Sequence, residues 1–159
     1  MLRAATSDDL VGLRDLERSA STAALGHVFP PPRFPYPDHR VLARWVIVLD
    51  DPEVEVLVEE LGGRLIGLTA YDGHWLRHLA VDPRHWGTGL ADRLLDTSLA
   101  RIAARGATSA QLWVLADNHR ARRFYERAGW LLGDGERTAE FPPHPIEVTY
   151  ASPPLVVPR

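Results

Sequence analysis

The sequence predicts an α/β (α+β) fold with helices on both faces of a β-sheet. Helical and strand periodicities follow the order helix, helix, three strands, helix, strand, helix and two strands. The 159 residues, 45% hydrophobic and 25% charged, fit a single domain over 1–159 that buries its own core. No apolar run approaches the ~18 residues of a membrane span, so we expect no membrane contact.

Two helices are expected in the N-terminal third. Residues 7–24 keep the helical spacing of one apolar face, made by Leu10, Leu13, Leu16 and Ala20. No helix can continue through Pro30–Pro37, because each proline lacks an amide donor and restricts the residue before it. The second helix is expected to begin near Asp38, with one face made by Val41, Leu42, Trp45 and Val46.

Strands and further helices follow. Alternating apolar residues predict strands over 53–59, 65–71 and 75–81. The next helix has an apolar stripe and ends at Gly106; the stripe is Leu90, Leu94, Leu95, Leu99 and Ile102. We then expect a buried strand over 109–115, a short helix from Asn118 to Gly129, and strands over 130–140 and 146–151. Residues 151–159 form a tail that is either flexible or packed on a partner subunit.

The composition excludes several kinds of chemistry. Without cysteine the chain has no disulfide, thiolate zinc site or cysteine nucleophile, and we expect no metal. All 18 basic residues are arginine, which excludes Schiff-base chemistry and a phosphate-binding loop that ends in lysine. A net charge of −3 without a basic block disfavours nucleic acid as a partner. The first residues lack the apolar core of a signal peptide, so we expect a cytoplasmic protein.

A first candidate site lies between a strand and a helix, at Trp86-Gly87-Thr88-Gly89-Leu90-Ala91. Two glycines let the backbone approach a ligand, and the free amides and dipole of the new helix favour an anion such as a diphosphate. An ordinary strand–helix turn is the alternative interpretation. A dinucleotide fingerprint is excluded, because Asp92 stands where its third glycine belongs.

A second candidate site spans Asp117–Trp130. Asn118, the only asparagine of the chain, stands where a strand gives way to a helix. Tyr125 lies beside Phe124 on the inward face of that helix. Taken singly, Asn118 is explained as a plain N-cap and Tyr125 as a core aromatic residue.

Together, the two segments resemble the GNAT superfamily of acetyl-CoA-dependent N-acetyltransferases. Its first signature, Gln/Arg-x-x-Gly-x-Gly/Ala, corresponds to Trp86–Ala91, with Trp86 where most relatives carry Gln or Arg. Its second, Asn-x-x-Ala-x-x-Phe-Tyr-x-x-x-Gly-Phe, is matched by Asn118, Ala121, Phe124, Tyr125, Gly129 and Trp130. The resemblance implies a mixed central sheet of six to seven strands. It also implies acetyl transfer from acetyl-CoA to a primary amine.

The resemblance further implies a set of site residues. The cofactor would contact Leu79, Ala80, Val81, Trp86, Gly87, Thr88, Gly89, Leu90, Ala91, Asn118 and Tyr125. The amine would attack the thioester directly, the Val81 amide would stabilise the oxyanion, and catalytic Tyr125 would protonate the thiolate. The acceptor would face the odd positions of the strand, which carry no base; they are Trp75, Arg77, Leu79 and Val81. The general base stays open between His74, His78, Asp72 and water.

The acceptor is expected to be a small-molecule amine or a peptide N-terminus. In such folds it would lie between the Pro30–Pro37 loop, with Phe34 and Tyr36, and the segment Glu136–Pro145. The alternative function is a catalytically silent module that binds acyl-CoA or another partner. A phenol at the sulfur favours catalysis, because a pure binder does not need one. Family members are often dimers, which allows a homodimer here.

Overall fold

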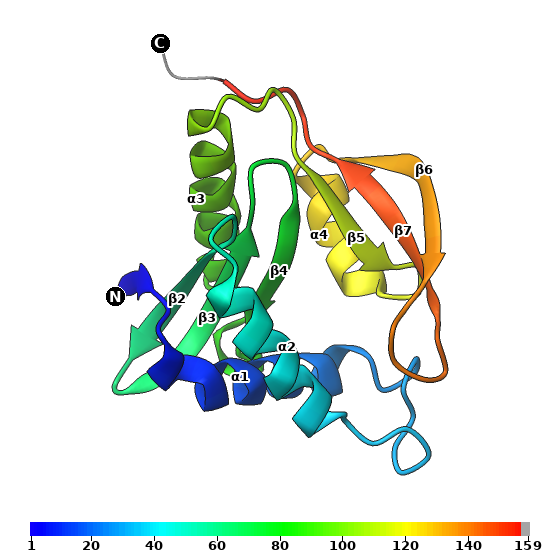
Figure 1. Cartoon of the computed structure of the whole chain (residues 1–159). Coiled ribbons are helices and arrows are strands. Elements are labelled where there is room, and N and C mark those ends of the chain that lie inside the picture. The colour runs from blue at the N-terminus through cyan, green and yellow to red at the C-terminus, as the bar shows by residue number, and fades with distance from the viewer. Residues whose placement is uncertain (157–159) are drawn as a thin grey trace.

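The computed structural model describes residues 1–156, and its elements confirm the predicted fold class (Figure 1). Within these residues the strands are β1 (Leu2–Ala4), β2 (Glu55–Leu61), β3 (Arg64–Tyr71), β4 (Leu76–Val81), β5 (Gln111–Leu115), β6 (Leu131–Thr138) and β7 (Ile146–Ala151). The helices are α1 (Leu10–Ala24), α2 (Asp38–Asp50), α3 (Leu90–Ala104) and α4 (His119–Arg127). Two short 3-10 turns, η1 (Ser7–Asp9) and η2 (Pro83–His85), precede α1 and follow β4.

The strands form two sheets rather than one continuous sheet. The first has the order β1-β2-β3-β4 and the second the order β5-β7-β6, with every neighbouring pair antiparallel. One parallel bridge joins the sheets, between Trp75 and Gln111. There the Gln111 amide donates to the His74 carbonyl at 2.9 Å. Beyond the bridge β4 and β5 diverge toward the end of the molecule at which α1 and α2 lie (Figure 1).

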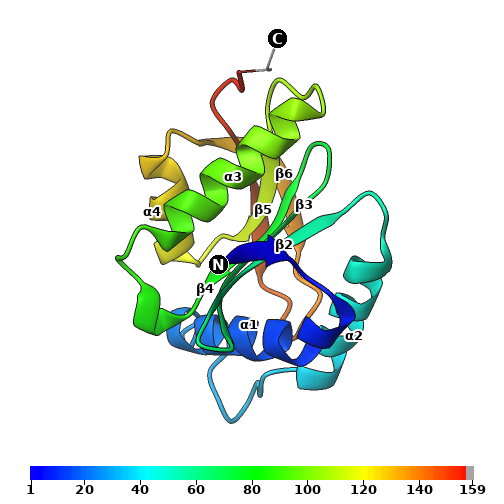
Figure 2. The ribbon, with the colours of Figure 1, turned by 90° about the vertical axis from the view of Figure 1, so that its left-hand side faces the viewer.

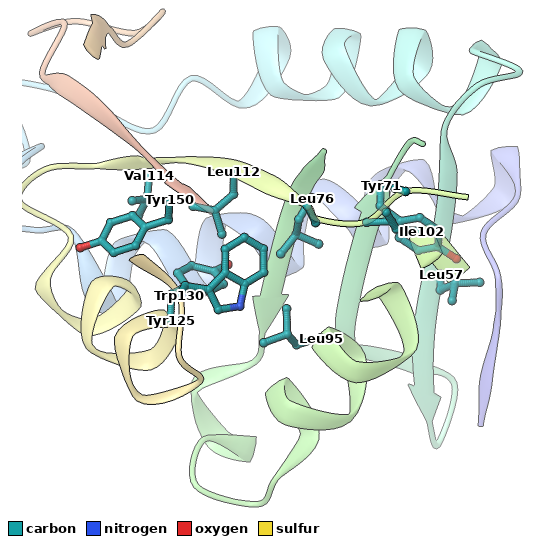
Figure 3. Close-up of a cluster of buried hydrophobic side chains, with 12 residues drawn as sticks. Leu57, Tyr71, Leu76, Leu95, Ile102, Leu112, Val114, Tyr125, Trp130 and Tyr150 are labelled. Atoms are coloured by element: carbon teal, nitrogen blue, oxygen red, sulfur yellow. The ribbon is translucent and has the colours of Figure 1, made fainter. Parts of the chain in front are cut away.

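Helices cover both faces of the first sheet, as expected (Figure 2). α1 and α2 cover one face, where the fully buried Trp45 packs in one cluster with Val58 and Leu68 of the sheet. α3 covers the other face and contributes Leu95 to a second cluster. That cluster continues to Leu112 of the second sheet and to α4 (Figure 3).

The sequence pattern does not predict β1. Its three residues pair with β2 at the edge of the first sheet, with Arg3 opposite Val58. Ion pairs from Arg3 to Asp9 at 2.8 Å and to Glu60 at 2.6 Å accompany this pairing. A three-residue strand is too short to show alternation, and contacts with residues distant in the sequence determine its position.

A bulge in β4 changes which side chains face which helices. Ala70 pairs with His78, but the next residue of β3, Tyr71, pairs with Leu76, so β4 holds one extra residue there. Leu76 and Leu79 therefore both lie on the α3 face of the sheet, although three positions separate them. His78 lies on the opposite face, with its ring 4.9 Å from that of Trp45 in α2. Ala80 lies on that face too, whereas Leu79 and Val81 pack on the α3 side, so it is the even positions His78 and Ala80, and not these odd ones, that face α1 and α2.

The chain after β7 returns along the segment before β5. The Ser152 amide donates to the Ala110 carbonyl at 2.8 Å, and the Leu155 amide to the Thr108 carbonyl at 2.8 Å. Of the tail predicted over 151–159, residues 157–159 lie outside the described residues. No helix within residues 1–156 combines the length and the apolar character needed to cross a bilayer.

Candidate functional site

The turn between β4 and α3 is built on Asp82 and two glycines. The side chain and the amide of Arg84 donate to the Asp82 carboxylate, which lowers the pKa of that group to about 2. Gly87 and Gly89 have φ angles of 75° and 81°, in the left-handed region that favours glycine. A Cβ atom at either position would meet nothing within 4 Å. Backbone conformation, and not crowding, therefore explains both glycines.

The same turn presents a row of unpaired amides. The Arg93 amide donates to the Gly89 carbonyl at 3.1 Å, at the start of α3. In the described part of the chain, the six preceding amides, from Gly87 to Asp92, have no backbone acceptor. Free amides at a helix N-terminus attract an anion, and the helix dipole adds to the attraction. The turn therefore fits an anion such as a diphosphate.

Trp86 contributes no hydrogen-bond donor to an anion here. Its indole Nε1 donates to the Val81 carbonyl at 2.9 Å, and an indole has only this one donor. The guanidinium of Arg120, from the first turn of α4, lies over the same ring at 3.7 Å from its centroid. The Trp86 ring thus connects the end of β4, the glycine turn and the start of α4.

The edge of β4 that faces β5 is unpaired. The Asp82 amide donates to the Ile66 carbonyl at 2.9 Å, so these two residues form a hydrogen-bonded pair. Such pairs alternate along an antiparallel ladder, so the backbone groups of Leu79 and Val81 point away from β3 toward β5. β5 pairs with β7 instead of β4 along this stretch. The Leu79 backbone and the Val81 amide are therefore available to a ligand.

A cleft of about 1140 Å³ runs between β4 and β5. Among the predicted site residues it brings together Leu79, Asn118 and Tyr125. The turn over 86–91 lies outside the lining, joined to α4 through the Arg120–Trp86 contact. Ala80 is not brought to the cleft, because its backbone pairs with β3 and its side chain packs in the α1–α2 cluster.

Asn118 and Tyr125 each have a structural role and also line the cleft. Asn118 Oδ1 accepts a hydrogen bond from the Ala121 amide at 3.1 Å, so Asn118 is the N-cap of α4. Tyr125 is 8% exposed, and its ring lies 5.5 Å from that of Trp130 (Figure 3). Burial raises the pKa of the Tyr125 hydroxyl. The hydroxyl therefore stays protonated at neutral pH.

The other end of the cleft lies between two loops, whose contributions include aromatic residues and prolines. Both loops can be followed in Figure 1. The α1–α2 loop contributes Phe34 and Tyr36 to the lining, and the β6–β7 loop contributes Phe141. Both segments expected to wall this space therefore line it. Trp75 and Trp113 also line the cleft, with parallel rings whose centroids are 6.2 Å apart.

The carboxylates that line the cleft are matched by arginines. Glu17 of α1 pairs with Arg44 of α2 and accepts a hydrogen bond from the Trp45 indole at 2.8 Å. The other carboxylates are also paired, Glu140 with Arg40 at 3.3 Å and Glu147 with Arg137 at 3.2 Å. The aromatic walls therefore surround charges that are largely compensated.

Among the base candidates, His78 is the one that lines the cleft. Burial, and then the positive charge of Arg44, lower the pKa of His78 to about 4. The imidazole is therefore neutral at physiological pH, but it is a weak base.

Asp72 and His74 belong to the β3–β4 turn. The Asp72 carboxylate accepts hydrogen bonds from the amides of His74 at 2.8 Å and Trp75 at 2.7 Å, and pairs with Arg77 at 2.8 Å. Burial alone would raise the pKa of Asp72, but these bonds together lower it. His74 is exposed, and neither residue lines the cleft.

Two features of the site are missed by the sequence analysis. The Glu17–Arg44 pair joins two helices, and no local pattern reports which helices pack together. Arg120 lies inside the second motif, in the first turn of the helix. The helix dipole disfavours a cation there, so an arginine at this position is a signal in the sequence that could have indicated an anion-binding role.

Comparisons with known proteins identify the family and similar folds. The sequence model of the acetyltransferase (GNAT) family matches residues 13–130. An uncharacterized N-acetyltransferase of Archaeoglobus fulgidus is 31% identical over 93 residues, 52% of this chain, which spans 62% of that relative's length. The ribosomal-protein-S18-alanine N-acetyltransferase of Escherichia coli has a TM-score of 0.71 at 18% identity, covering 100% of this chain and 96% of that one. The PaiA N-acetyltransferase of Thermoplasma acidophilum, solved in complex with coenzyme A, has a TM-score of 0.70 at 15% identity, covering 96% and 97%. On the strength of the family match, this chain belongs to the acetyltransferase (GNAT) family.

Proposed function

We propose that the protein is an acetyl-CoA-dependent N-acetyltransferase that acetylates a primary amine directly. The main support is the cleft between β4 and β5, which connects the free edge of β4 with Asn118, Tyr125 and an aromatic space between two loops. A thioester and an amine can meet in such a passage from opposite ends. Family membership, and the coenzyme A bound by the PaiA N-acetyltransferase, support the same donor here.

The residues present fit acetyl-CoA, which would supply an acetyl group activated as a thioester. The free amides of Gly87 to Asp92 would hold its diphosphate. The outward backbone groups of Leu79 would pair with the pantetheine arm, along which Asn118 also lies, while the Val81 amide would face the acetyl group. Trp86 would act through its position in the turn, since its single donor is already used.

The amine nitrogen would attack the acetyl carbonyl carbon. The new C–N bond forms while the C–S bond breaks, and the thiolate leaves. We assign the Val81 amide to the oxygen on which negative charge develops, because it is a fixed donor at the unpaired edge of β4. The surplus proton of the amine passes to water, and Tyr125 gives its proton to the thiolate and regains one from solvent.

Burial keeps the Tyr125 hydroxyl protonated but also makes it a weaker acid, and its effect on the thiolate offsets this. An ordinary phenol has a pKa of about 10 and is already protonated at neutral pH. Burial raises the pKa of Tyr125 further. The same apolar surroundings disfavour a charged thiolate beside it, which increases the tendency of the sulfur to accept a proton.

Water is the base that we propose. His78 lines the cleft, but a pKa of about 4 means that it would hold a proton poorly near neutral pH. Asp72 is engaged by two amides and Arg77 in its turn. His74 lies outside the cleft lining.

We propose an acceptor with a single primary amine next to an apolar or aromatic group, either a small molecule or a peptide N-terminus. Phe34, Tyr36 and Phe141 supply the matching walls. A polyamine would need several uncompensated carboxylates, whereas the carboxylates of this cleft are paired with arginines.

Thiol release from acetyl-CoA tests the proposal, and the absence of cysteine from the chain removes the protein's own background. We expect faster release with 2-phenylethylamine or phenylalanine amide than with spermidine. Tyr125→Phe should lower turnover about 100-fold with little change in acetyl-CoA affinity. Tyr71→Phe is the matched control, because the Tyr71 hydroxyl bonds Glu55 at 2.6 Å and does not line the cleft.

The outcomes separate the two candidate functions. Binding of acetyl-CoA without thiol release for any amine would favour the silent acyl-CoA-binding module. Absence of binding would refute both the acetyltransferase and the acyl-CoA-binding module. The homodimer and the cytoplasmic location stay predictions from the sequence.

A further inference from the structure

We infer that Arg120 supplies the cation that binds the diphosphate of acetyl-CoA and that Trp86 holds it in place. The inference rests on the proposed function and adds a residue that the proposal does not use. The free amides of the turn over 86–91 are neutral hydrogen-bond donors. They carry no full positive charge to balance the two negative phosphates of the diphosphate.

The position of Arg120 is set by stacking. Its guanidinium lies 3.7 Å from the centroid of the Trp86 ring, and Trp86 directly precedes Gly87. The ring is itself anchored, because its Nε1 donates to the Val81 carbonyl at 2.9 Å. A planar guanidinium stacked on an indole keeps its edge donors free while its orientation is limited. The stack therefore fixes a cation next to the turn.

The donors of Arg120 are not engaged by protein groups. Among residues 1–156 no ion pair or hydrogen bond involves its guanidinium, although it makes the contact with Trp86. Arg122, two residues later, differs: it donates to the Tyr150 hydroxyl at 2.9 Å and to the Ala116 carbonyl at 2.8 Å. Arg122 therefore supports the fold, whereas Arg120 presents a charge that an anion can use.

The helix itself disfavours a cation at this position. Arg120 stands in the first turn of α4, where the helix dipole is positive, and that turn contains no acidic residue. A bound diphosphate would turn this unfavourable placement into a favourable one. The free amides at the start of α3 and the cation at the start of α4 then act on the same anion from two helices.

Calorimetry with three donors tests the inference. Acetyl-CoA and acetyl-3′-dephospho-CoA both carry the diphosphate, whereas S-acetylpantetheine carries no phosphate. We expect Arg120→Gln to weaken binding of the first two by about ten-fold and to leave the third unchanged. Arg120→Lys should recover only part of the loss, because an ammonium does not stack as a guanidinium does. Arg123→Gln, an exposed residue of the same helix, is the control and should bind all three donors normally.

A double-mutant cycle identifies the part played by Trp86. In a Trp86→Ala background, Arg120→Gln should add little further loss, because the guanidinium has already lost its platform. Undiminished binding of both nucleotides by Arg120→Gln would overturn the inference. An equal loss for S-acetylpantetheine, or a loss confined to acetyl-CoA and absent with its 3′-dephospho form, would do the same. If the wild-type protein binds none of the donors, the proposed function fails first and the Arg120 inference falls with it.

Discussion

Replacing His78 with glutamine removes a titrating group that the fold keeps uncharged. The His78 side chain leaves β4 toward α2, with its ring 4.9 Å from that of Trp45. Burial and the charges of Arg44 and Arg77 favour the neutral ring, while Glu17 opposes them, and the pKa falls from 6.5 to about 4. Folding therefore disfavours the protonated imidazole.

This lowered pKa predicts how much stability depends on pH. Between pH 6.5 and 4 the unfolded chain binds a proton at His78 that the folded chain does not bind. The free energy of unfolding therefore falls as the pH falls through this range. At about 1.36 kcal/mol for each pH unit, the contribution of His78 to this loss is about 3 kcal/mol at the acid end. Below pH 4 both states are protonated and the loss stops growing.

Urea unfolding of wild type and His78→Gln, from about pH 7.5 to about pH 4.5, measures the effect. The stability of the wild type should decrease relative to that of the variant on acidification, because only the wild type has this proton to bind. The carboxylates titrate in both proteins, so the difference isolates His78. His74→Gln, at an exposed position, should follow the wild type. A constant difference between wild type and His78→Gln across this range would refute the reasoning.

Further substitutions test the turn, the packing and the choice of base. Gly89→Asp adds a negative charge to the turn and puts a residue with a Cβ atom at a φ of 81°, where it is strained. Calorimetry should show that acetyl-CoA binding is lost. Retained affinity would mean that the turn has only a structural role. Gly67→Ala would bring a Cβ to 2.9 Å from Leu94 Cδ1 in the core beneath α3. Urea unfolding should therefore show that the free energy of unfolding falls by about 1–3 kcal/mol. Unchanged stability would mean that α3 shifts to accommodate the methyl group at little cost. Asp72→Asn removes the charge that pairs with Arg77, so it should lower the free energy of unfolding by about 1 kcal/mol while turnover stays near that of the wild type. A large loss of turnover would indicate that Asp72 is the general base.

Local patterns predict much of the fold. The stripe that contains Leu90, Leu94 and Ile102 identifies α3, and those side chains are buried as expected. The pattern of α2 is less reliable, because Val41 and Trp45 are buried but Val46 is 50% exposed. Helical spacing locates an apolar face only to within a residue or so. The sheet and helices packed against it decide which side chains on its border are covered.

The site is predictable where it depends on backbone conformation. Gly87 and Gly89 adopt left-handed φ angles that few other residues tolerate, so their positions in the sequence already mark the turn. The bulge at Arg77 is different. It depends on pairing with β3, and it places Leu76 on the α3 side of the sheet together with Leu79. A regular alternation of residues cannot reveal one extra residue in a strand.

By itself, the order of residues determines the helices, most of the strands, the glycine turn and the inward placement of Tyr125, because each depends on neighbours within a few positions. Tertiary structure alone decides that β4 and β5 separate into two sheets. It also decides that Glu17 meets Arg44 and that Arg120 stacks on Trp86. These contacts join segments far apart in the chain, and their existence depends on how whole elements pack and not on any local preference.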